Sequence, residues 1–130
     1  MCIRDRAQAN AGLLTDVSNT VDTFMTDLRE HDASEEVTLL LFSEFGRRVI
    51  DNGSGTDHGA AGVAFAVGEH VKGGVYGTYP SLEPSQLEEG GNLKFNLDFR
   101  SVYSTILEDW FQLDPEPIVN GNFERTKFFA

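Results

Sequence analysis

An apolar run, Val37–Phe42, constrains the fold more than any other stretch of this sequence. Its only polar residue is Thr38, and this pattern is typical of a strand buried on both faces, as in a parallel sheet. A one-sided helical pattern precedes it over Ala7–Glu30, where apolar residues recur three and four positions apart. A helix that leads into such a strand is half of a β–α–β unit. We therefore expect an α/β protein with a mostly parallel sheet and flanking helices.

Further elements are predicted downstream of this strand. Val63–Val67 is a second apolar run with a glycine at either end, which indicates a second strand. Leu93–Leu97 alternates apolar and polar residues, as a half-exposed strand does. Asp98 suits the N-cap of a helix that runs to about Gln112. Residues 113–130 are expected to form a loosely packed tail.

The start of the chain is set apart from the fold. Residues 1–6 resemble the translated adaptor sequence that heads fragments assembled from metagenomic reads. Native sequence is therefore expected to begin near Ala7. Val37–Phe42 and Val63–Val67 are the only two parallel-type strands predicted, and two strands do not make a free-standing sheet, so the strands that would flank Val37–Phe42 are missing. Both observations indicate that residues 7–130 are the C-terminal portion of a larger α/β domain.

The charge of the chain excludes some classes of partner. It has 21 acidic residues against 10 Lys and Arg in 130 residues, a formal net charge of −11. Nucleic acids and anionic membranes bind basic surfaces, so neither is an expected partner. No apolar run approaches the roughly 18 residues of a membrane span. Cys2 is the only cysteine, so an internal disulfide is impossible.

The glycine-rich segment Asn52–Gly59 carries the side chains best suited to chemistry. Asp57 and His58 are adjacent in it, and in a glycine loop both can turn toward one point. A carboxylate and an imidazole would suit two ligands of a divalent cation. The alternative is a turn in which Asp57 caps its own backbone and His58 is exposed.

Two charged residues follow the apolar run directly. Glu44 would suit a third metal ligand or a general base, and the alternative is a carboxylate that neutralises Arg47 or Arg48. Arg47 would hold an anionic group through its planar guanidinium, and the alternative is a surface ion pair of little energetic value. The sequence contains no Walker motif, dinucleotide fingerprint, paired-cysteine spacing or Gly-x-Ser-x-Gly elbow.

Four blocks in a fixed order resemble one protein family. They are Leu39–Arg47, Asn52–Gly59, Val71–Gly77 and Asp98–Tyr103. The family is the bacterial domain of unknown function 1501, described as exported by the twin-arginine route and as similar to alkaline phosphatases and sulfatases. The resemblance implies a partial alkaline-phosphatase-like three-layer sandwich. It also implies a periplasmic or exported location, although no signal sequence is visible.

The same resemblance implies a function and a set of site residues. The whole protein would hydrolyse a phosphate or sulfate ester, an anionic small molecule, with a divalent metal such as Zn, Mn or Ca. His58, Asp57 and Glu44 would be metal ligands, and Arg47 would contact the anion. Glu44 aligns with the Asp of the superfamily's ligand pair, or else Asp57 and His58 are themselves that pair.

One departure from the superfamily pattern favours an alternative function. Phe45 stands where the superfamily has a His ligand. A non-catalytic exported binding or structural module that keeps the fold is therefore the alternative. The nucleophile and the other ligands come from an N-terminal part in that superfamily, so this chain alone is expected to be inactive.

Overall fold

The computed structural model describes residues 7–53 and 55–130, so the adaptor-like start lies outside the described residues. The chain divides into two compact units. The first unit runs through Glu69 and includes Ser81–Lys94. The second unit consists of His70–Pro80 and Phe95–Ala130. In the part of the chain that is described, no helix is long and apolar enough to cross a membrane.

The first helix, α1, spans Ala7–Glu30, as the sequence predicts. Met25 near its C-terminal end is only 3% exposed, whereas Leu14 and Val17 are 68% and 50% exposed. The apolar stripe is therefore buried toward the C-terminal end of the helix and open along much of the rest. The helix ends because Asp32 has a φ of +54°, which lets Ala33 N–H donate to the Leu28 carbonyl oxygen.

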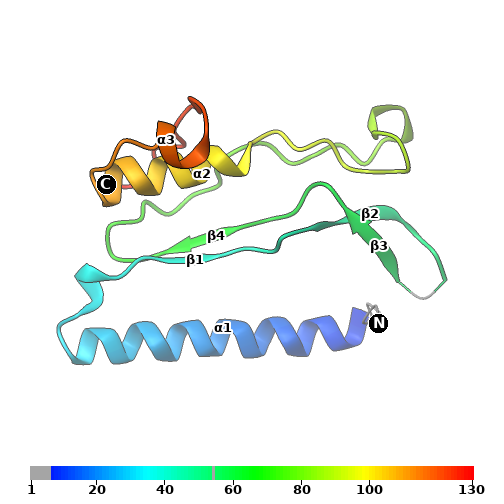
Figure 1. Cartoon of the computed structure of the whole chain (residues 1–130). Helices are drawn as coiled ribbons and strands as arrows, with labels where there is room; N and C mark the ends of the chain where they lie inside the picture. The colour runs from blue at the N-terminus through cyan, green and yellow to red at the C-terminus, as the bar shows by residue number, and fades with distance from the viewer. Residues whose placement is uncertain (1–6, 54) are drawn as a thin grey trace. The chain divides into compact units, whose positions relative to one another are not determined.

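The strands of the first unit form two antiparallel pairs and not a parallel sheet (Figure 1). A short 3₁₀ turn, η1 (Ser34–Glu36), leads into β1 (Leu39–Leu41), which pairs with β4 (Phe65–Val67). Between them, β2 (Gly46–Asp51) pairs with β3 (Thr56–Gly59). The expected mostly parallel sheet and the alkaline-phosphatase-like three-layer sandwich are therefore wrong for this structure.

The physical reason lies between β1 and β4. Parallel strands need a crossover connection of a dozen or more residues, usually a helix. Residues 43–64 instead contain the β2–β3 hairpin, whose tight turn at Asn52–Gly55 reverses the chain. The chain therefore returns antiparallel to β1. Leu39, Leu40 and Leu41 are only half-buried, so this apolar run is not covered on both faces.

Two further predictions about local structure were wrong. The glycine-rich segment was expected to be a loop, but its second half is β3. Leu93–Leu97 was expected to be a strand, but it has no regular secondary structure. The remaining element of the first unit is a 3₁₀ turn, η2 (Pro84–Gln86). It lies in the proline-containing segment, where Pro84 fixes φ at the first position of the turn.

The second unit is built on one continuous helical segment. α2 (Phe99–Thr105) passes directly into η3 (Ile106–Trp110), a π-helical turn. Asp98 caps it as predicted, since its side chain accepts a hydrogen bond from Arg100 N–H at 2.9 Å. A short helix, α3 (Glu116–Val119), follows.

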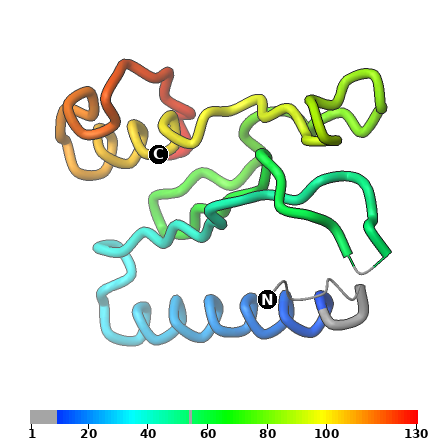
Figure 2. Tube along the Cα trace, turned by 45° about the vertical axis from the view of Figure 1, so that its right-hand side comes forward, coloured from blue at the N-terminus to red at the C-terminus, as the bar shows by residue number. Residues whose placement is uncertain are grey.

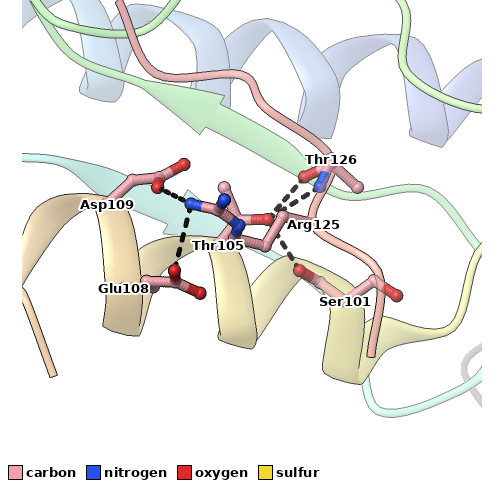
Figure 3. A network of polar contacts seen from close by, with 6 residues as sticks. All are labelled: Ser101, Thr105, Glu108, Asp109, Arg125 and Thr126. Atoms are coloured by element: carbon pink, nitrogen blue, oxygen red, sulfur yellow. Dashed lines mark hydrogen bonds and ion pairs between the residues drawn. The ribbon is translucent and has the colours of Figure 1, made fainter. Parts of the chain in front are cut away.

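The C-terminal segment returns along α2 and η3 (Figures 1 and 2). The Thr105 hydroxyl donates to the Ser101 carbonyl oxygen and accepts from Thr126 N–H, while Arg125 Nη1 lies 2.5 Å from Asp109 Oδ1 (Figure 3). Beyond this point, Phe128 is 4% exposed. Most of residues 113–130 thus follow a path set by α3, a polar network and a buried aromatic side chain.

Candidate functional site

The β2–β3 hairpin positions the residues that the sequence singled out. Its register places Gly46 opposite Gly59 and Arg47 opposite His58. A Cβ atom at Gly59 would lie 2.7 Å from the Arg47 carbonyl carbon on β2, and one at Gly46 would lie 1.4 Å from the Ala61 carbonyl oxygen just after β3, so only glycine allows these approaches of the backbones. The glycine pair therefore brings the two strands together immediately beside Arg47 and His58.

Arg47 and His58 share one face of the hairpin. Residues directly opposite in an antiparallel pair project to the same side, and so do residues two apart on one strand. The His58 ring stacks on Phe45, with ring centroids 3.7 Å apart and planes inclined by 11°. The Arg47 Cζ atom lies 5.6 Å from the Phe45 centroid, and its Nη1 donates to the Thr56 carbonyl oxygen at 2.8 Å. A guanidinium and an imidazole thus flank one aromatic ring.

Asp57 lies on the other face of the hairpin. Successive residues of a strand point to opposite sides, and Asp57 precedes His58 within β3. Its Oδ1 accepts a hydrogen bond from Asn52 Nδ2 at 2.8 Å, across the turn. The structure therefore brings His58 together with Arg47, and brings Asp57 together with Asn52.

Glu44 is exposed and precedes β2. Within residues 7–53 and 55–130, no three His, Cys, Asp or Glu side chains are grouped so that they could hold a metal ion. The described residues of the chain do not by themselves gather Glu44, Asp57 and His58 into a ligand set. A metal bound by these side chains would need a rearrangement of the hairpin or further ligands.

Two contacts of the candidate residues were not predicted from the sequence. Phe45 stacks on His58, and Asn52 bonds to Asp57. A signal for both was present, since the dipeptide Asn52-Gly53 between extended segments is a strong hairpin signal. A hairpin centred on Asn52-Gly53 places Asn52 in the turn and Arg47 and His58 on paired strands.

The site is thus a small hairpin that presents a guanidinium and an imidazole on one face. The family model described as "Protein of unknown function (DUF1501)" matches residues 4–121, nearly the whole chain. The chain therefore belongs to the DUF1501 family, as its four sequence blocks predicted. Among curated proteins and solved structures, none matches this chain.

Proposed function

We propose that this protein binds the anionic group of a phosphate or sulfate ester on the hairpin face that carries Arg47 and His58. The observation that supports this is their register, since the two residues lie directly opposite each other in β2 and β3. A guanidinium offers N–H donors in a planar fork that matches phosphate and sulfate oxygens. An imidazole N–H can donate to the same group, and a protonated imidazole adds positive charge.

The surroundings of both side chains favour this function. The Phe45 ring holds the His58 imidazole plane, and the bond to the Thr56 carbonyl oxygen holds one arm of the Arg47 guanidinium. Side chains that are already oriented lose less conformational entropy when a ligand binds. His58 is exposed, so a solvent-borne anion could reach it without an opening step.

A more specific proposal is that the protein also hydrolyses the bound ester. By the family resemblance, His58, Asp57 and Glu44 would bind a divalent ion, Zn, Mn or Ca, and the ion would supply charge stabilisation for the ester. The described residues do not fit that role as they stand, because Asp57 faces away from His58 and bonds to Asn52. By the same family resemblance, the protein would be exported or periplasmic.

A specific observation favours a second candidate, a non-catalytic exported binding or structural module. The His58 ring is stacked face to face with Phe45 at 3.7 Å, a packing arrangement that fixes an imidazole without any metal. Such a module would bind an anion at the hairpin and would carry out no chemistry on it.

Titration with inorganic phosphate and with sulfate, followed by the amide NMR signals of β2 and β3, tests anion binding. We expect Arg47→Gln and His58→Gln each to weaken binding by roughly tenfold, the value of one charge-assisted hydrogen bond. Arg48→Gln is the matched control, because it removes the same charge from the neighbouring position of β2, which is not the partner of His58 in the register. Equal losses in the two arginine variants would reveal unspecific charge attraction and refute the site.

Metal analysis separates the two candidates. Stoichiometric Zn, Mn or Ca in the purified protein, lost in His58→Ala, would support the hydrolase. The absence of bound metal, together with a melting temperature that chelator leaves unchanged, would contradict the hydrolase and leave the binding module.

A further inference from the structure

Asp51 ends β2, and Asn52 and Gly53 begin the turn to β3; all three residues are exposed. Asn52 N–H donates to the Gly55 carbonyl oxygen at 2.8 Å, and Gly53 has a φ of +88°, so the chain turns here. We propose that Asn52 is a site of spontaneous covalent modification, in which its side-chain amide is lost through a cyclic imide with Gly53.

The atoms and charges of this step balance with water alone. The Gly53 backbone nitrogen attacks Cγ of Asn52, a new C–N bond closes the ring, and the C–N bond to the side-chain nitrogen breaks. The side-chain nitrogen leaves as ammonia with the proton given up by the Gly53 N–H. Water then opens the imide to aspartate or to isoaspartate. Glycine favours the attack because it has no Cβ to shield its nitrogen.

Asp51 occupies the position of a proton acceptor for this step. The Gly53 N–H donates to Asp51 Oδ1 at 2.6 Å. A carboxylate at hydrogen-bond distance from a nitrogen that must lose its proton is placed to act as a general base. Asp51 is exposed and is the last residue of β2, directly before the turn, and the two groups are already in hydrogen-bond contact.

The chain contains a second Asn-Gly pair that serves as an internal comparison. Asn120 is the left-handed C-cap of α3, and Gly121 N–H donates to the Glu116 carbonyl oxygen at 3.2 Å. The acceptor of this N–H is a backbone carbonyl oxygen, which does not take up the proton as the Asp51 carboxylate can. We expect Asn120 to react more slowly than Asn52 for this reason.

The modification would alter the hairpin that carries the candidate site. Asn52 Nδ2 donates to Asp57 Oδ1 at 2.8 Å, and its conversion places one carboxylate beside another. The hydrogen bond between residue 52 and Asp57 is replaced by repulsion between two carboxylates, and the added negative charge lies near His58. The product should therefore bind phosphate less tightly. This consequence rests on the proposed function, whereas the modification itself does not.

Peptide mapping by mass spectrometry, after incubation of the folded protein in mildly alkaline buffer, tests the proposal. An enzymatic assay of isoaspartate measures the second product. We expect Asn52 to be converted several-fold faster than Asn120, because both attacking N–H groups are hydrogen-bonded but only the acceptor at Gly53, the Asp51 carboxylate, can take up the proton. Conversion of Asn120 at an equal or higher rate, or no conversion of Asn52, would overturn the proposal.

Two controls make the result specific to the fold. In urea-unfolded protein both Asn-Gly pairs should react at similar rates, because neither turn persists. Asp51→Ser should slow the reaction at Asn52 several-fold and leave Asn120 unchanged, since it removes only the acceptor. An unchanged rate at Asn52 in that variant would show that Asp51 is not the base. Mass is the readout throughout, so failure of anion binding would not affect the outcome.

Discussion

Replacing Asp98 with alanine removes the N-cap of α2. The Asp98 carboxylate accepts from Arg100 N–H at 2.9 Å, and its two oxygens also accept from Arg100 Nε at 2.9 Å and Nη2 at 2.7 Å. A helix leaves its first backbone N–H groups without partners, and α2 has only seven α-helical residues over which to spread this loss. The alanine variant therefore leaves the start of the second unit's main helical segment uncapped.

The magnitude follows from these contacts. Loss of an Asp N-cap costs about 1 kcal/mol of unfolding free energy, with a range of roughly 0.5–2. The ion pair adds little, because the side chains of Arg100 and Asp98 are 41% and 24% exposed. We expect Asp98→Ala to lower the unfolding free energy by about 1 kcal/mol and the melting temperature by roughly 3–6 °C.

The assay is urea unfolding followed by the fluorescence of Trp110, the single tryptophan. Trp110 ends η3, and its ring stacks on Phe129 with centroids 5.6 Å apart, so its emission reports on the second unit. Asp98→Asn is the matched control, since asparagine caps a helix as well as aspartate but carries no charge. It should keep most of the stability.

The pH dependence gives an independent check. Hydrogen bonding to the Arg100 side chain lowers the pKa of Asp98 in the folded state, against a weaker opposing effect of burial. The stabilisation is therefore present above the ordinary carboxyl pKa of about 4 and is lost as the pH falls through the lowered folded value. Wild type and Asp98→Ala should converge in stability in acid. An equal urea midpoint for both proteins at neutral pH, or Asp98→Asn as unstable as the alanine variant, would refute the capping argument.

Three other substitutions test the packing. Gly46→Ala should destabilise by about 3 kcal/mol in urea, because its Cβ would overlap the Ala61 carbonyl group. Gly12→Ala meets no atom within 4 Å and should stabilise α1 by roughly 0.5–1 kcal/mol. Thr105→Val should cost about 1–3 kcal/mol, because it leaves Thr126 N–H without its 2.9 Å acceptor. Wild-type urea midpoints for Gly46→Ala and Thr105→Val, or a lowered one for Gly12→Ala, would contradict these assignments.

Local signals in the sequence predicted α1 and the start of α2, whereas α3 lies in the segment that was expected to be a tail. The three- and four-residue spacing of apolar side chains predicted α1, and Asp98 predicted the start of α2, because both patterns depend on contacts within a few residues. The second apolar run predicted the strand that became β4. Each of these features can be read along the chain without knowing what lies beside it.

The strand pairing could not be read in the same way. Leu39–Leu41 is apolar whether it pairs in parallel or antiparallel, so its composition carries no information about direction. The Asn52-Gly53 dipeptide was the signal that indicated an antiparallel hairpin, but the whole glycine-rich segment was interpreted as a loop. This difference also alters the candidate site, because Asp57 and His58 lie on opposite faces of a regular strand and not side by side in a loop.

The sequence by itself determined the family, the acidic charge, helix α1, the start of α2 and the residue types available for chemistry, because these depend on identity and local order. Only the tertiary structure decided which of those residues meet. The cross-strand register places Arg47 opposite His58, and the turn brings the Asn52 side chain to within hydrogen-bond distance of Asp57. Both contacts depend on how the two strands align, which local sequence does not determine. The same register set the aromatic ring of Phe45 against His58.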